Sequence, residues 1–331
     1  MQDIRSSDPK ALVRALFAPI AEDMAAVDAI IREELDSDVP RMREIGEHIV
    51  NAGGKRMRPA LLMLICRALG YEGELHRYLG ATIELLHTAT LMHDDVVDES
   101  AVRRGKPTAN ALWGNGVAVL VGDFLYTRSF QMMIRAGNLR VMQALADAAN
   151  TLAEGEVKQM VNAHDPTVDE KRYFEVIERK TACLFEAGAK MAAAIADCSE
   201  KDEAAVREYA LALGNAFQIV DDMLDYTGVS SDIGKNLGAD LREGKVTLPL
   251  LYARLHTSEE NRALIDAAIR SGNGDFDKIS SIVIESQAIA RCKQRAEQEL
   301  ERGKAALLQL SPSIFRDSLL KLLFYTVCRD R

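Results

Sequence analysis

Apolar residues recur every three to four positions along most of this chain, which is the spacing of an amphipathic α-helix. No stretch alternates apolar and polar residues convincingly, as a half-buried strand would. Most of the eight prolines stand where a helix should begin or end. We therefore predict an all-α fold, with helices at 9–37 (broken near Pro19), 41–51, 59–69, 75–98, 108–115, 117–136, 139–163, 169–197, 202–226, 246–256, 258–270, 274–288, 289–309 and 313–328.

The predicted helices follow one another without a Ser-, Gly- or Pro-rich linker, so we expect one domain over residues 1–331, with 1–8 flexible. The one sizeable irregular stretch is Thr227–Gly244, which is rich in Gly and Asp. A helix from Leu75 to Asp94 would be about 28 Å long, enough to line a deep interior. The expected architecture is a helical bundle around a central apolar cavity.

Composition and charge exclude several classes of protein. The formal net charge is −9, which argues against a nucleic-acid binder. The five cysteines are widely spaced and form no CxxC pair, as expected of reduced thiols in a cytoplasmic protein. The first residues lack the apolar region of a signal peptide, and the longest apolar runs, such as 61–66 and 116–122, are too short to span a bilayer. We expect a soluble, cytoplasmic protein with no transmembrane segment.

One acidic pattern, Asp-Asp-x-x-Asp, occurs twice in the sequence. In a helix its first and fifth residues lie on one face, about 6 Å apart. Carboxylates crowded together repel one another, and Mg²⁺ suits them because it binds oxygen and completes its coordination with substrate phosphates. Alone, either motif is equally typical of a solvated acidic helix end, but two copies in apolar sequence favour a diphosphate site. The predicted metal ligands are Asp94, Asp95, Asp98, Asp221, Asp222 and Asp225.

Basic residues stand on both sides of the first motif. Arg103 and Arg104 follow it in a turn, and the segment Gly53-Gly54-Lys55-Arg56-Met57-Arg58 precedes a helix that begins at Pro59. Cations and flexible backbone before a helix are typical of an anion site. For the earlier segment the alternative is a tight turn with solvated basic side chains. It lacks the spacing of a Walker A loop.

Two further positions interrupt apolar helix faces. His87 precedes Asp94 by about two turns on nearly the same face, which favours phosphate contact. A lone histidine among leucines is, however, more often hydrogen-bonded within the core. Lys180-Thr181 interrupts another apolar face, with a surface ion pair to a nearby glutamate as the alternative.

The second motif has polar and basic neighbours as well. Phe217 and Gln218 lie one turn before it, so that an aromatic ring and an amide oxygen, which suit a carbocation, would project beside the carboxylates. Lys235 and Lys245 flank the Gly-containing segment 236–244. This arrangement fits a lid that brings positive charge onto a diphosphate, with an ordinary solvated loop as the alternative.

Six segments, in this order and at these intervals, closely resemble the trans-type (E-) polyprenyl diphosphate synthases. They are GGKRMRP, LMHDDVVDESAVRRGKPT, Glu154-Gly155-Glu156, Lys180-Thr181, FQIVDDMLDY and GKNLGADLREGKVTLPL. The resemblance covers about residues 10–331, and no motif position departs from the family pattern. Within the family the chain is most similar to the bacterial octaprenyl diphosphate synthases, which make quinone side chains such as that of ubiquinone.

The resemblance implies an all-helical prenyltransferase, usually a homodimer, with both aspartate motifs at the mouth of its cavity and transient membrane contact on product release. It implies Mg²⁺, three ions per active site with substrate bound, held chiefly by Asp94, Asp98 and Asp221. The implied ligands of the allylic diphosphate are Arg103, Lys180, Lys235 and Lys245, with Thr181 and Gln218 lining its site. The implied ligands of isopentenyl diphosphate are Lys55, Arg58, His87 and Arg104. The catalytic set would be Asp94, Asp98, Asp221, Lys180 and Gln218.

The implied reaction is successive head-to-tail condensation of isopentenyl diphosphate onto an allylic diphosphate. Product length would depend on depth, because Ala89 and Thr90 lie about 6–8 Å below the aspartates along the helix. Their small side chains would leave a channel past Leu86 and as far as Met133, which predicts a long product; the resemblance implies that this product is octaprenyl diphosphate. Close helix packing is the alternative reason for small residues there.

Other functions explain less of the sequence. A product of another length, from geranylgeranyl to decaprenyl diphosphate, would need the same motifs. A phosphohydrolase of the HD type would use His93-Asp94 but leaves the second aspartate motif unexplained, and a terpene cyclase seldom needs the Gly53–Pro59 segment. A noncatalytic helical scaffold predicts internal repeats of 30–50 residues, which we do not find.

Overall fold

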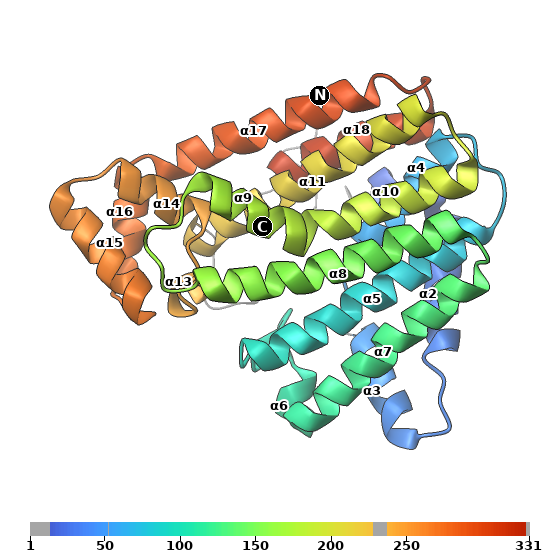
Figure 1. Ribbon diagram of the computed structural model, residues 1–331, viewed down its shortest axis with the longest axis horizontal. Coiled ribbons are helices and arrows are strands. Elements are labelled where there is room, and N and C mark those ends of the chain that lie inside the picture. Colours follow the sequence, from blue (N-terminus) through green and yellow to red (C-terminus); the bar gives the residue numbers. More distant parts are fainter. Residues whose placement is uncertain (1–13, 52, 228–236, 329–331) are drawn as a thin grey trace. The chain divides into compact units, whose positions relative to one another are not determined.

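The computed structural model describes residues 14–51, 53–227 and 237–328, and over these ranges it is helical apart from one short hairpin (Figure 1). The all-α prediction is therefore confirmed. The elements are η1 (Ala18–Ile20), α2 (Ala21–Glu34), α3 (Pro40–Asn51), α4 (Met57–Ala68), α5 (Leu75–Val97), β1 (Val102–Arg103), β2 (Lys106–Pro107), α6 (Ala109–Trp113), α7 (Asn115–Arg135), α8 (Leu139–Asn162), α9 (Glu170–Ile177), η2 (Glu178–Ala182), α10 (Cys183–Ala196), α11 (Glu200–Thr227), α13 (Ala239–Arg242), α14 (Leu248–Leu255), α15 (Glu259–Ser271), α16 (Phe276–Glu285), α17 (Ala288–Leu307) and α18 (Ile314–Cys328).

The structure differs from the predicted elements in three places. The hairpin formed by β1 and β2, which pair antiparallel and place Val102 opposite Pro107, lies where the sequence predicts only a turn. The expected helix at 169–197 contains a π-helical turn, η2, between α9 and α10. The irregular stretch after residue 226 contains a short helix, α13. Two-residue strands and single-turn helices are too short to produce a periodic pattern.

The contacts divide the chain into two compact units. Unit 1 comprises Met1–Ala149, Leu184–Ala210 and Lys304–Tyr325, and unit 2 comprises Asn150–Cys183, Leu211–Gly303 and Thr326–Arg331. The boundaries fall inside or at the ends of helices, not in a linker. The single domain expected over 1–331 stays a prediction.

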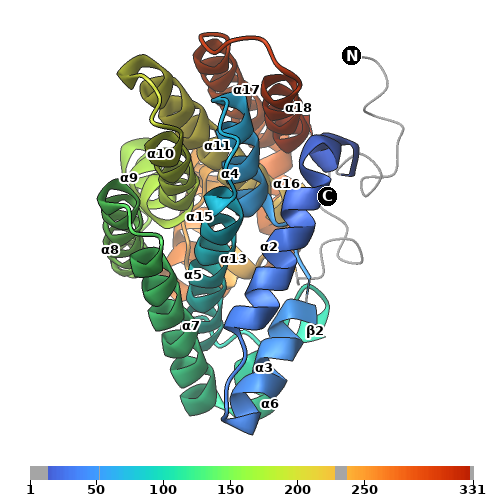
Figure 2. The same ribbon diagram turned by 90° about the vertical axis from the view of Figure 1, so that its right-hand side faces the viewer.

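In unit 1, helix α5 packs against α7, α4 and α2 (Figure 2). Helix α4 is apolar on every side, and its residues from Pro59 to Cys66 are buried, as expected of a helix enclosed by others. Helix α5 is also largely buried, including Leu79, Ile83 and Leu86. Its packing fixes the helix whose last turns carry the first aspartate motif.

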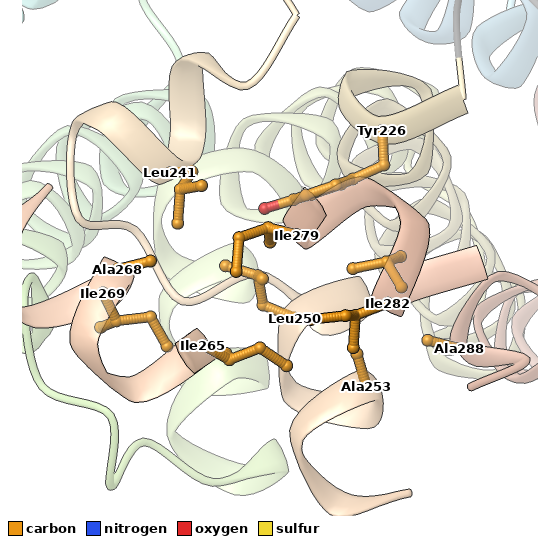
Figure 3. Close-up of a cluster of buried hydrophobic side chains, with 11 residues drawn as sticks. Tyr226, Leu241, Leu250, Ala253, Ile265, Ala268, Ile269, Ile279, Ile282 and Ala288 are labelled. Carbon is orange, nitrogen blue, oxygen red and sulfur yellow. The ribbon is translucent and has the colours of Figure 1, made fainter. Parts of the chain in front are cut away.

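Unit 2 contains two apolar clusters. The first brings together residues of α11, α13, α14, α15, α16 and α17, among them Tyr226, Leu241, Leu250 and Ile279 (Figure 3). The second joins α9, α11, α14 and α17 through Tyr173, Ile177, Ile219, Val220, Met223, Leu224, Leu248, Leu251, Cys292 and Ala296. Both clusters include residues within or next to the second aspartate motif, so this motif is set in packed apolar surroundings.

No helix in the described part of the chain is long and apolar enough to cross a membrane. The five cysteines form no disulfide, and Cys66, Cys183 and Cys292 are buried.

Candidate active site

The two aspartate motifs lie in the C-terminal turns of their helices. Asp94 and Asp95 stand in the last turn of α5, with Asp98 as its C-cap, and Asp221 to Asp225 lie in the last two turns of α11. Neither helix has a basic residue in its last turn. A helix C-terminus carries partial negative charge, so these carboxylates add to a negative potential instead of neutralising it. Both places therefore favour a cation.

In unit 1 the middle carboxylate of the motif is held by the protein itself. Asp95 is 6% exposed and accepts a hydrogen bond of 2.8 Å from Nε of Arg103. The backbone carbonyl of Asp95 accepts 3.1 Å from the side-chain amide of Asn110. Asp94 and Asp98 are more accessible, as their positions on one helix face predict. Arg103, predicted to bind a diphosphate, is thus placed beside the motif through Asp95.

The hairpin after the motif presents Arg104 at its tip. Its two turn residues, Arg104 and Gly105, have φ of 53° and 74°, the positive values of the tight turns that join antiparallel strands. The Arg104 guanidinium donates to the carbonyl of Gly53. The hairpin and the segment before α4 therefore meet, and residues of both line a cavity of about 70 Å³.

The N-terminal end of α4, from its N-cap Arg56 to Arg58 in its first turn, is bonded to α5 by two neighbouring contacts. Arg56 donates 2.8 Å to Glu84, a buried carboxylate, and Arg58 donates 2.9 Å to Nε2 of His87. Glu84 and His87 lie about one turn apart on α5, so both contacts hold the same face of the helix. Lys55 donates 3.3 Å to the phenol oxygen of Tyr325. The four residues predicted to bind isopentenyl diphosphate, Lys55, Arg58, His87 and Arg104, all lie in unit 1.

Burial, and then repulsion between positive charges, lower two pKa values in this cluster. Burial, and then repulsion by Arg58 and three further arginines (Arg104, Arg103 and Arg56), hold the pKa of His87 well below 6.5. Burial also lowers the pKa of Arg104. His87 is consequently neutral, and its Nε2 accepts the proton that Arg58 shares. A cluster that suppresses a further positive charge is suited to bind an anion.

In unit 2 the π-helical turn carries Lys180 and Thr181. Lys180 donates 2.7 Å to Glu156 and 2.8 Å to Gln159, both on α8. A Cβ on Gly155 would lie 2.8 Å from Cβ of Arg179 and 2.9 Å from the backbone nitrogen of Lys180. Gly155 therefore allows α8 to approach the π-helical turn closely. These contacts explain the Glu154-Gly155-Glu156 segment physically, and π turns are frequent at functional sites.

Asp222 is the buried centre of a hydrogen-bond relay. It is 3% exposed and accepts 2.7 Å from the phenol of Tyr173 and 2.7 Å from the side-chain amide of Gln218. The oxygen of that amide accepts 2.8 Å from the hydroxyl of Thr181. Burial first, and then repulsion by Asp240, raise the pKa of Asp222 well above its usual value.

Asp225 is held by backbone N–H groups. Its carboxylate accepts hydrogen bonds of 3.1, 3.3 and 3.3 Å from the N–H groups of residues 238–240, at the start of α13. Lys245, at the far end of this segment, pairs with Glu243, and its N–H donates 2.8 Å to the carbonyl of Asp240. Lys235 lies outside the described residues. Asp225 thus anchors the segment that leads to Lys245.

The four residues predicted to set product length lie in unit 1 and are all buried. Ala89 and Leu86 are 0% exposed, Met133 is 4% exposed and Thr90 is 9% exposed. Thr90 satisfies its hydroxyl by donating 2.8 Å to the carbonyl of His87 in its own helix. His93, the residue that suggested an HD-type site, instead lies against α7, with Nε2 3.3 Å from the carbonyl of Val119.

The structure adds residues that the sequence interpretation missed. Arg56, Glu84 and Asn110 position the unit 1 cluster, and Tyr173 positions Asp222. Two of these residues, Glu84 and Tyr173, have a feature in the sequence that could have identified them. Glu84 is a lone charge within an apolar helix, and Tyr173 precedes Lys180 by seven residues, two turns of helix. Within the described ranges no three Asp, Glu, His or Cys side chains are already arranged as a metal site.

Known proteins match both the sequence and the fold. The family model described as polyprenyl synthetase matches residues 39–285. The octaprenyl diphosphate synthase of Escherichia coli K12 is 47% identical over 94% of this chain and 97% of its own. The all-trans-nonaprenyl-diphosphate synthase (geranyl-diphosphate specific) of Rhodobacter capsulatus is 44% identical over 93% of this chain and 95% of its own.

Solved structures agree with this match. A polyprenyl synthase from Caulobacter crescentus, complexed with calcium and isoprenyl diphosphate, has a TM-score of 0.93 and 38% identity, covering 96% of this chain and 98% of its own. A decaprenyl diphosphate synthase from Rhodobacter capsulatus has a TM-score of 0.91 and 43% identity, covering 96% of this chain and 99% of its own.

The close approach at Gly155 predicts a stability effect. Gly155→Ala should lower the free energy of unfolding by roughly 1–3 kcal/mol, because the added methyl meets backbone that cannot move cheaply. Urea denaturation measures this. Gly116→Ala is the control, since no atom lies within 4 Å of its added Cβ, and it should be neutral or stabilising by up to about 1 kcal/mol. Equal stability of the Gly155 variant and the wild type would contradict the packing.

The low pKa of His87 predicts a pH effect on stability. Below pH 6.5 the unfolded chain protonates this histidine and the folded chain does not, so stability falls as the pH falls toward the folded-state pKa. Between pH 7.5 and 5.0 the wild type should lose more unfolding free energy than His87→Gln, by at most about 2 kcal/mol. His256→Gln, outside this cluster, is the control. If the wild type and His87→Gln lose the same amount, His87 is not held neutral.

Proposed function

This chain belongs to the polyprenyl synthetase family and is a prenyltransferase, and we propose that its product is octaprenyl diphosphate, made for the side chain of a quinone such as ubiquinone. The observation that carries the reaction class is the pairing of two chemistries, carboxylates at the C-terminal turns of α5 and α11 and a separate basic cluster around a neutral His87. The carboxylates suit a diphosphate bound through metal ions. The basic cluster suits a second diphosphate bound without metal.

The donor set fits Mg²⁺. Its members are hard carboxylate oxygens, and the helix C-termini that carry them have no basic residue in their last turn. Asp94, Asp98 and Asp221 would hold the ions, with Asp95, Asp222 and Asp225 in support. When bound, Mg²⁺ neutralises charge on the leaving diphosphate. The calcium-bound relative from Caulobacter crescentus supports a divalent cation in this family.

The basic cluster of unit 1 would bind isopentenyl diphosphate. Arg58 and Arg104 present guanidinium groups, which match phosphate oxygens two at a time. Arg56 and Glu84 bind each other and so hold the start of α4 against α5. Because His87 is neutral, its remaining ring N–H can donate to a phosphate oxygen without adding charge that the cluster disfavours.

The polar groups of unit 2 would serve the allylic substrate. Lys180 and Lys245 would supply positive charge for its diphosphate. The oxygen of Gln218 and the hydroxyl of Thr181 present dipoles to the carbocation that forms when the allylic C–O bond breaks. The alkene of isopentenyl diphosphate attacks that cation, a new C–C bond forms, and the departing diphosphate accepts the proton lost.

Product length and oligomeric state are two further parts of the proposal. The products named for relatives at 43–47% identity range from octaprenyl to decaprenyl, so identity alone leaves the length open, and the small buried Ala89 supports a long product. A homodimer is supported by exposed apolar side chains on α7 and at the start of α8, such as Leu120, Ile134 and Leu139. A cytoplasmic location and transient membrane contact during release complete the proposal.

The reaction class is testable with purified protein. With Mg²⁺, an allylic diphosphate and isopentenyl diphosphate, we expect diphosphate release together with an eight-unit product identified by mass spectrometry. Omitting isopentenyl diphosphate, or adding a chelator, should abolish both signals. Diphosphate release that persists without isopentenyl diphosphate would contradict condensation, and a product of another length would contradict the octaprenyl assignment alone.

The depth argument predicts a change of product. Ala89→Phe should place a ring about 8 Å below Asp94 along α5 and stop the chain after a few isoprene units while turnover continues. Chromatography of products measures this. Ala118→Phe adds the same bulk at a buried alanine on α7 and is the control for general packing damage. An eight-unit product from the active Ala89 variant would refute the role of depth.

A further inference from the structure

We propose that Tyr173 is a positioning residue for ionisation of the allylic substrate, acting through Asp222 on the amide of Gln218. The inference rests on the proposed function, because that function places the Gln218 oxygen beside the developing cation. Tyr173 lies on α9. Its hydroxyl donates to Asp222 of the second motif and not to a residue predicted to bind substrate.

The geometry gives each oxygen of Asp222 a different partner. The Tyr173 hydroxyl donates to Oδ2 at 2.7 Å, and Nε2 of Gln218 donates to Oδ1 at 2.7 Å. With one oxygen held by a phenol, the carboxylate cannot rotate freely, so the direction in which it draws the amide is fixed. Tyr173 and its acceptor Asp222 are 4% and 3% exposed, so water is a poor substitute for the phenol as donor.

The relay then sets which end of the Gln218 amide faces the site. Because the NH₂ group is bound to Asp222, the carbonyl oxygen is left to meet the Thr181 hydroxyl, at 2.8 Å. An amide turned the other way would present its positive end to a carbocation. The orientation of the Gln218 amide therefore depends on Asp222. Through Asp222 it also depends on the Tyr173 hydroxyl, which is two hydrogen bonds away.

The ring of Tyr173 packs in the apolar core, whereas its hydroxyl makes the hydrogen bond to Asp222. Its ring packs in the apolar cluster formed by α9, α11, α14 and α17, and meets Phe174 edge to face with centroids 5.4 Å apart. The hydroxyl is the part that reaches Asp222. Tyr173→Phe keeps the ring and removes only the donor, so packing and positioning can be told apart.

The first test is steady-state kinetics of Tyr173→Phe in the condensation assay. We expect kcat to fall about ten- to hundredfold, in line with the cost of leaving a buried acceptor unsatisfied, with KM for isopentenyl diphosphate within about twofold of wild type. Tyr252→Phe, which removes a phenol that donates 3.1 Å to Glu170 in the same unit, is the control and should leave kcat unchanged. A kcat for Tyr173→Phe within twofold of wild type would overturn the inference.

The second test asks whether Tyr173 acts through Gln218. In a double-mutant cycle with Gln218→Met, Tyr173→Phe should cost less than about threefold, because the group that it orients is already gone. Thr181→Val, at the other end of the relay, should be non-additive with Tyr173→Phe in the same way. Losses that multiply would identify a general structural role and overturn the inference. An inactive wild type would overturn the proposed function itself.

Discussion

Negative charge gathered at the negative ends of two helices is the constraint on which the rest of this molecule depends. Helices α5 and α11 both finish in three aspartates, and neither offers a basic residue in its last turn. Such an arrangement is unfavourable for an isolated helix, because the carboxylates repel one another and the helix dipole. It persists where burial of the rest of the helix provides the stability, as it does for α5 among α2, α4 and α7.

The protein itself relieves part of this repulsion, and it does so with different hydrogen-bond donors at three of the carboxylates. Asp95 is paired with Arg103, Asp222 takes two neutral donors, and Asp225 takes three backbone N–H groups. Neutral donors lower repulsion without cancelling charge. The middle aspartate of each motif, Asp95 or Asp222, is thus buried and bonded within the protein, and Asp225 holds the segment that leads to Lys245.

Periodicity was enough to find the long helices, because burial of one face imposes it, and the all-α class follows from α4, α5 and α11 alone. It could not find the β1–β2 hairpin, which two positive-φ turn residues create without any apolar repeat. The motifs predict candidate site residues by type, whereas the contacts that support those residues could not be predicted. The contacts of Glu84 with Arg56 and of Tyr173 with Asp222 join residues 28 and 49 positions apart, and sequence spacing within one helix says nothing about such pairs.

A single helix links metal binding with the depth of the interior. Asp94 and Ala89 both lie on α5, a helix buried along most of its length, so the distance between them is set by the helical rise and cannot relax independently. A growing chain whose diphosphate is held at Asp94 would therefore be measured from a fixed origin. Side-chain volume below Asp94 along α5 would then be the variable that sets product length.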